Sequence, residues 1–311
     1  MSAHDIATER RFLFSSIAGN ALIGCVGAAI AVLSSSQAIL LDALFNLTYL
    51  ASGLFTLKVA RLVHQGDDAH FPAGYAYFEP LVNGIKGLLV LGVSVMALAG
   101  AVEALFSGGR EISPGLAVGY GVFATIVCWI IALLTRRGAK RTSSPLLQAD
   151  ALNWVINGAI SSCVLAAFIG MALIRDTALD GLVPYVDPGL VLVVVLISIS
   201  APIRMAWTAL MELLNRAPTP EVTTQVRTIV EQALAGLPVQ SLAVRVVQPG
   251  RTRIVLAHVV LPRDFAVSRL ADFDAVRTAA NTKLQAQHAS TICDIVFTAD
   301  PALGAPVSPA P

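Results

Sequence analysis

The chain has 311 residues, of which 56% are hydrophobic and 13% are charged, against about 25% charged residues in an ordinary soluble domain. Its mean hydropathy is +0.73. A soluble protein of this length cannot bury so much apolar surface, so the composition excludes a purely soluble enzyme and a disordered chain. The net charge of +1 gives no electrostatic footprint for nucleic acid, and the four scattered cysteines indicate neither a disulfide framework nor a zinc cluster.

Six stretches are long and apolar enough to cross a membrane, since a spanning helix needs about 20 mostly apolar residues. They are residues 12–33, 38–63, 81–105, 116–134, 146–174 and 190–213. The first stretch is too long for a cleaved signal peptide and lacks a small-residue cleavage site. We therefore predict an α-helical membrane domain of six transmembrane helices over residues 1–213.

Basic residues fall mainly on one side of these spans. Only Arg110 and Arg175 fall on the other side. Because Lys and Arg are enriched in cytoplasmic segments, the richer side is predicted to be cytoplasmic. An even number of spans then puts both termini in the cytoplasm of a cell membrane, which we expect to be a bacterial inner membrane. The residues on the richer side are Arg10, Arg11, Lys58, Arg61, Arg136, Arg137, Lys140, Arg141, Arg204 and Arg216.

Residues 214–303 have the composition of a soluble domain. After a Pro-marked break at residues 217–221, the patterns predict a helix at 221–235, strands at 242–247 and 252–261, a helix at 268–287 and a strand at 292–298. The order α-β-β-α-β is typical of a small ferredoxin-like α+β domain. The Pro-rich tail at 304–311 is predicted to be disordered.

Polar side chains form a stripe on each of two predicted spans. On the second span, Asp42, Asn46 and Tyr49 share one helix face. On the fifth span, the shared face carries Asp150, Asn153, Asn157 and Ser161. Polar groups inside a bilayer are costly and mark functional sites, although such residues also join helices through hydrogen bonds. Lys86, in the third span, either pairs with Asp150 or extends to the membrane interface.

Five segments resemble those of the cation diffusion facilitators, which are transporters with six spans and a cytoplasmic domain. The resemblance implies a homodimer in the lipid bilayer that exchanges a divalent metal cation for protons. The cation would be substrate, with no bound cofactor and no nucleic-acid partner. The segments are SQAILLDALFNLTYLAS (36–52), GYAYFEPL (74–81), ADALNWVINGAISS (149–162), LLNRAPTPE (213–221) and GRTRIVLAH (250–258).

The residues at the family's transport-site positions depart from its His/Asp pattern. One register places that site on Phe45 and Tyr49 of the second span and on Asn153 and Asn157 of the fifth. A register shifted by three residues uses Asp42 and Asn46 instead. In either register a tetrahedral zinc site is missing, and an oxygen-lined site suits harder cations such as Mn²⁺ or Mg²⁺.

The resemblance also implies accessory sites outside the spans. Asp68 and His70 would lie at the cytoplasmic mouth, while His258 and Asp300 match metal-binding positions of the cytoplasmic domain. Two ligands do not make a tight site, so a surface His and a turn Asp is the alternative interpretation.

Taken together, these patterns predict a secondary transporter rather than an enzyme. It would export a divalent cation by proton antiport, through a site between the second and fifth spans. Two alternatives stay open: a family member that carries a cation other than a transition metal, and a non-transporting subunit of a heteromeric transporter.

Overall fold

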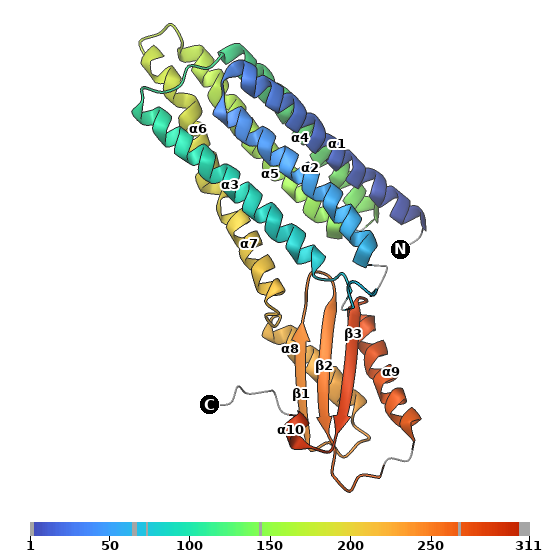
Figure 1. The fold of residues 1–311 in the computed structure, drawn as a ribbon. Helices are drawn as coiled ribbons and strands as arrows, with labels where there is room; N and C mark the ends of the chain where they lie inside the picture. The colour runs from blue at the N-terminus through green and yellow to red at the C-terminus, as the bar shows by residue number, and fades with distance from the viewer. Residues whose placement is uncertain (1–2, 64–66, 73, 143–144, 267–268, 305–311) are drawn as a thin grey trace. The chain divides into compact units, whose positions relative to one another are not determined.

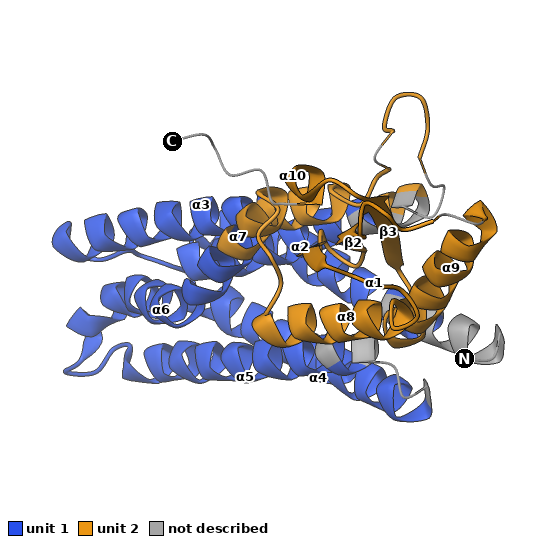
Figure 2. Ribbon diagram, turned by 90° about the horizontal axis from the view of Figure 1, so that it is seen from below, with its two compact units in different colours: residues 1–57, 85–206 blue, residues 58–84, 207–311 orange. Residues whose placement is uncertain are grey.

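The computed structural model describes residues 3–63, 67–72, 74–142, 145–266 and 269–304. It divides into two compact units, one of residues 1–57 and 85–206 and the other of residues 58–84 and 207–311, coloured blue and orange in Figure 2. Among the described residues, the regular elements of the first unit are all helices, and the second unit contains the only sheet. The predicted domain boundary at residue 213 stays a prediction.

The described residues contain six long apolar helical segments, as the sequence predicted (Figure 1). The first five are α1 (Ala3–Ser34), α2 (Gln37–Val63), α3 (Phe78–Phe106), α4 (Pro114–Thr142) and α5 (Pro145–Ile174). Large apolar side chains such as Phe14, Met96 and Leu173 are exposed on these helices. A membrane or a further protein surface must cover them, because water would not favour such an extensive apolar exterior.

The sixth segment differs from its predicted form. It begins earlier, with a short 3₁₀ turn at Asp180–Leu182, and consists of α6 (Val183–Ser198) and α7 (Ser200–Leu213). The break follows from Pro202, which has no N–H to donate to the Ser198 carbonyl and whose ring crowds that turn. The earlier start places Asp187 inside a helix of the bundle, where it is fully buried.

Small residues allow close helix packing in the first unit. A Cβ atom on Gly19 of α1 would lie 3.0 Å from Ile131 of α4 and 3.1 Å from Trp154 of α5. A Cβ atom on Gly87 of α3 would lie 2.9 Å from the Ala206 backbone nitrogen of α7. Glycine at these positions lets the backbones approach, which is a common device in membrane helix bundles.

The second unit contains the predicted α-β-β-α-β arrangement. Its elements are α8 (Pro220–Ala233), β1 (Ser241–Val247), β2 (Arg253–Val260), α9 (Leu270–Gln287), β3 (Thr291–Thr298) and the short α10 (Pro301–Gly304). The strand order is β1-β2-β3, with β1 antiparallel and β3 parallel to β2. The predicted tail lies outside the described residues, except for Gly304.

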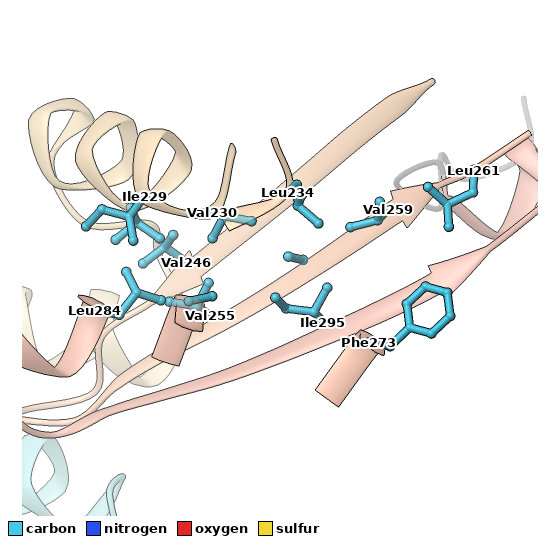
Figure 3. Close-up of a cluster of buried hydrophobic side chains, with 13 residues drawn as sticks. Ile229, Val230, Leu234, Val246, Val255, Val259, Leu261, Phe273, Leu284 and Ile295 are labelled. Carbon is cyan, nitrogen blue, oxygen red and sulfur yellow. The ribbon is translucent and has the colours of Figure 1, made fainter. Parts of the chain in front are cut away.

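One face of this sheet carries the hydrophobic core. Along β2, the alternate residues Val255, Ala257 and Val259 are fully buried. They pack with Val230 of α8 and Leu284 of α9, and Figure 3 shows this cluster between the helices and the sheet. The core lies wholly within residues 217–304, so this segment has the apolar interior that an independent domain requires.

We therefore expect a fragment of residues 217–304 to be soluble, to unfold cooperatively on heating and to self-associate. Its dimerisation should depend only weakly on zinc, because the described residues contain no cluster of three His, Cys, Asp or Glu side chains that could hold a metal ion. Sedimentation with zinc and with a chelator measures this dependence. A dimer that forms strictly with zinc would contradict the expectation.

Candidate functional site

Asp42 of α2 lies at the centre of one buried polar cluster. Its carboxylate accepts a hydrogen bond of 2.6 Å from the Tyr120 hydroxyl of α4 and one of 3.1 Å from the Asn46 amide, one turn along α2. The same amide also donates to the Asp42 carbonyl oxygen at 2.8 Å. We call Asp42, Asn46 and Tyr120 the Asp42 cluster.

Gly27 of α1 makes room for this cluster. A Cβ atom at Gly27 would lie 2.7 Å from the Tyr120 hydroxyl oxygen and 3.0 Å from the Ala43 side chain. Any larger residue would therefore push Tyr120 away from Asp42. The sequence stripe identified Asp42 and Asn46 but not Tyr120, whose polar group is a single hydroxyl in an otherwise apolar span.

Asp150 of α5 lies in a second polar cluster. Its carboxylate accepts a hydrogen bond of 3.1 Å from the Ser16 hydroxyl of α1, and Trp154 donates to that hydroxyl oxygen at 2.6 Å. We call Asp150, Ser16 and Trp154 the Asp150 cluster. Ser16 and Trp154 were missed because neither residue is unusual within an apolar helix.

Lys86 of α3 adds a positive charge beside the second cluster. Its ammonium nitrogen lies 4.4 Å from the centroid of the Tyr49 ring of α2. No salt bridge joins Lys86 to Asp150 among the described residues, so their pairing stays a prediction. Tyr49 and Asp42 are seven residues apart on α2, so this region lies about 10 Å along the helix from Asp42.

Each cluster contains a buried oxygen atom with no hydrogen-bond donor among the described residues. These atoms are Oδ1 of Asn46 and Oδ2 of Asp150. A buried polar atom without a partner costs about 1–3 kcal/mol. A cation bound at either cluster would use the unpartnered oxygen atom there as a ligand and remove that cost.

The remaining residues of the predicted transport site contribute less to these clusters. Phe45 packs against an apolar cluster that includes Leu41, Ala101 and Val191. Asn153 is exposed and Asn157 is half-buried. Ser161 lies 3.8 Å from the Cys128 sulfur of α4. Within the described residues, no hydrogen bond joins the polar stripe of α2 to that of α5.

Asp187 of α6 has a structural role at the start of α2 and lies outside both clusters. Its carboxylate accepts hydrogen bonds from the Ser36 hydroxyl, from the Gln37 backbone N–H at 3.0 Å and from the Ala38 backbone N–H at 3.3 Å. These amides are unpaired donors at the start of α2. Asp187 therefore caps α2 from a different helix, and its oxygens are already occupied.

Asp68 organises the loop between α2 and α3. It accepts hydrogen bonds from the Tyr75 hydroxyl and from the backbone N–H groups of His70 and Phe71. The Tyr75 hydroxyl, together with those two amides, holds the pKa of Asp68 below its usual range. Both Asp68 and His70 are exposed.

His258 and Asp300 occupy separate places in the sheet unit. His258 is half-buried on β2, beside Val296 of β3 in the parallel register. Asp300 follows β3 and accepts a hydrogen bond of 3.0 Å from the Ala302 backbone N–H, which caps α10. No hydrogen bond joins His258 to Asp300 in the part of the chain that is described.

Segments that resembled the cation diffusion facilitators meet in the second unit. Glu79, in the first turn of α3, accepts hydrogen bonds from the Arg251 backbone N–H at 2.8 Å and from its Nε atom at 2.7 Å. Glu212 of α7 accepts one from Gly250, whose φ of +57° suits the turn between β1 and β2. Tyr77 donates to the Asn215 side chain.

We expect Glu79→Gln to lower the unfolding temperature of the purified protein. The Glu79 side chain is 10% exposed, and its carboxylate stabilises both the Arg251 side chain and a backbone amide. Glu103→Gln is the matched control, because Glu103 is exposed on the same helix and its side chain has no hydrogen bond among the described residues. Equal melting curves for the two variants would show that the Glu79 contact contributes little.

The fold and the buried charges define a multi-pass membrane protein with polar sites inside a helix bundle. A family model for the cation efflux transmembrane domain matches residues 13–214. The chain belongs to this family. It is also similar to the magnetosome protein MamM of Paramagnetospirillum magneticum, strain ATCC 700264 / AMB-1, with 22% identity over 177 residues. That match covers 57% of this chain and 54% of the relative, so the chain spans about half the length of the curated relative it matches.

Proposed function

We propose that this transporter exports a divalent metal cation in exchange for protons, through a site to which α2 and α5 contribute Asp42 and Asp150. The observation that supports this proposal most is the pair of buried oxygen atoms without donors, Oδ1 of Asn46 and Oδ2 of Asp150. Each belongs to a cluster that also holds a carboxylate. Carboxylate and amide oxygens are the ligands of a cation site inside a bilayer.

The chemistry of these ligands favours a hard cation. Asp42, Asn46, Tyr120 and Asp150 offer oxygen atoms only, and the described residues contain no cluster of His and Cys that would select zinc. Mn²⁺ and Mg²⁺ are the divalent cations that prefer such ligands. Among these ligands, the carboxylates are the groups suited to proton exchange near neutral pH, whereas the amide does not titrate.

The same proposal includes a homodimer in a cell membrane. Many apolar side chains of α3 are exposed, including Leu88, Leu89 and Met96. They provide the apolar surface that lipid or a second copy would cover.

Transport by purified protein in proteoliposomes tests the function. Fluorescent indicators would report uptake of Mn²⁺, Mg²⁺ and Zn²⁺, and of Na⁺ and K⁺ as monovalent cations, with and without a pH gradient. We expect Mn²⁺ or Mg²⁺ flux that increases with the gradient and exceeds Zn²⁺ flux. No flux of any divalent cation would contradict the proposal and favour a non-transporting subunit, while flux of monovalent cations alone would favour the other alternative.

The orientation is tested by labelling single cysteines in a variant that lacks Cys25, Cys128, Cys163 and Cys293. Because basic residues mark the cytoplasmic side, we expect an impermeant thiol reagent to label Ser113→Cys, but not Lys140→Cys or Pro249→Cys, in intact cells. Ser113 and Lys140 are exposed near opposite ends of α4. Labelling of Lys140→Cys from outside would reverse the proposed orientation.

A further inference from the structure

The hydroxyl group of Ser16 joins two helices, unlike that of its neighbour on α1. Ser15 donates to the Phe12 carbonyl oxygen of its own helix at 2.6 Å, which is a common way for a helical serine to satisfy its hydroxyl group. The Ser16 hydroxyl instead donates to Oδ1 of Asp150 on α5 at 3.1 Å. Because Ser16 is only 6% exposed, little water reaches this contact. The Ser16 hydroxyl is thus committed to the Asp150 carboxylate.

Trp154 fixes the direction of that hydrogen bond. The Trp154 indole nitrogen lies 2.6 Å from the Ser16 hydroxyl oxygen, and an indole N–H can only donate. The oxygen of Ser16 therefore accepts from Trp154, and its single hydrogen is left for Asp150. Gly19 of α1 makes room for the buried indole ring, because a Cβ atom there would lie 3.1 Å from its Cη2 atom. The hydrogen bonds thus run in one direction, from Trp154 through Ser16 to Asp150.

The two carboxylates differ in how many of their oxygen atoms are bonded. Asp42 accepts from Asn46 at Oδ1 and from Tyr120 at Oδ2. Asp150 accepts from Ser16 at Oδ1, while its Oδ2 atom is buried with no hydrogen-bond partner among the described residues. A carboxylate that binds a metal ion is ordinarily held by such an outer hydrogen bond, which orients it toward the ion. The bond at Oδ1 therefore leaves Oδ2 as the oxygen atom at which a cation can bind.

We infer that Ser16 and Trp154 are positioning residues of the transport site, which hold one oxygen atom of Asp150 and leave the other to the transported cation. This inference rests on the proposed function, since it assumes that Asp150 binds that cation. The apolar part of α1, Phe14–Ser34, contains no charged residue. Ser16 nevertheless gives this helix a part in the site, because it acts through the carboxylate that α5 supplies.

Binding of Mn²⁺ to the purified full-length protein, measured by calorimetry in detergent, tests the inference. We expect Ser16→Ala to weaken binding about tenfold or more, which is the usual effect of removing a group that holds a metal ligand. Ser16→Thr keeps the hydroxyl group and should restore most of the affinity. Trp154→Phe keeps a ring but removes the indole N–H, and should weaken binding less than Ser16→Ala does. Ser15→Ala is the matched control, because the Ser15 hydroxyl donates to a carbonyl group of its own helix.

A double-variant cycle separates positioning from a general effect on the structure. If Ser16 acts through Asp150, Ser16→Ala should change the affinity much less in the Asp150→Asn background than in the wild-type background. A structural defect would instead weaken binding by the same factor in both backgrounds. Melting curves show whether each variant folds. Should Ser16→Ala not fold, Trp154→Phe is compared in the same two backgrounds.

The outcomes separate the inference from the proposed function. If the wild type binds Mn²⁺ and Asp150→Asn weakens that binding, wild-type affinity in both Ser16→Ala and Trp154→Phe overturns the inference alone. An equal loss of affinity in the two backgrounds of the cycle also overturns it. If the wild type does not bind Mn²⁺, or if Asp150→Asn binds it as the wild type does, the proposed function fails at this site and the inference falls with it.

Discussion

Asp42→Asn and Asp150→Asn are each expected to reduce pH-gradient-driven cation flux in proteoliposomes to the level of empty vesicles. Each substitution preserves the size of the side chain but removes a negative charge and the capacity to exchange a proton. The neighbouring groups that remain, Asn46, Tyr120 and Ser16, are neutral and cannot replace it. The loss should therefore affect both cation binding and coupling to protons.

Matched variants distinguish this effect from a general loss of structure. Asp176→Asn is the control, since Asp176 is exposed in the turn after α5, outside both clusters. Size-exclusion profiles and melting curves should show that all variants fold. If the double variant Asp42→Asn/Asp150→Asn retains wild-type flux with the same pH dependence, the two clusters only join helices, and Asp68 and His70 become the next candidates for coupling.

Tyr120→Phe provides a finer test within the Asp42 cluster. It removes the hydroxyl that donates to Asp42 at 2.6 Å and keeps the ring that packs beside Phe123. A change in cation affinity without loss of the fold would place Tyr120 among the residues that position the Asp42 carboxylate.

The membrane helices could be predicted because each is marked in the sequence by an uninterrupted run of mostly apolar residues. An apolar run of about 20 residues has few alternatives to a spanning helix. The break between α6 and α7 was harder to foresee, since Pro residues are tolerated in spanning helices and only the surrounding packing decides whether the helix is interrupted. The early start of α6 was missed for a similar reason, because Pro184, Asp187 and Pro188 interrupt the apolar run.

The polar stripes identified the carboxylates but not their partners. The helical period places residues of one helix on a common face, yet it carries no information about which helix lies opposite. In the structure, Asp42 accepts a hydrogen bond from Tyr120 of α4, and Asp150 accepts one from Ser16 of α1. Such long-range contacts depend on close packing at residues such as Gly27, which the sequence alone does not connect to Tyr120.

The contact between Glu79 and Arg251 is a second long-range contact that the sequence does not predict. The sequence singled out both segments only through their resemblance to a family. In the structure, they lie together with Glu212 and Gly250 around one turn of the sheet unit. Hydrogen bonds from Arg251 and Gly250 to the two glutamates thus join these segments, and the sequence alone does not show that they are neighbours.

Asp187→Ala is expected to lower the free energy of unfolding of the helical unit more than Tyr120→Phe or Asp176→Asn does. The carboxylate accepts three hydrogen bonds at the start of α2 and is fully buried. Its removal leaves the Ser36 hydroxyl and two backbone N–H groups without their acceptor. Hydrogen bonds to a charged group contribute about 1.5–3 kcal/mol each, and a negative charge at a helix N-terminus adds a favourable interaction with the helix dipole.

The expected result is a melting temperature lower by about 10 °C or more, or a protein that no longer survives purification. Asp187→Asn keeps one acceptor oxygen and should lie between Asp187→Ala and the wild type. Asp180→Ala is the matched control, because Asp180 is exposed in the preceding 3₁₀ turn and its carboxylate accepts one hydrogen bond, of 3.2 Å, from the Asp176 backbone N–H. Fluorescence-detected melting of the three variants in detergent measures the order. If Asp187→Ala melts no lower than Asp180→Ala, the capping contact does not determine the stability of α2, and water reaches the freed donors of Ser36, Gln37 and Ala38.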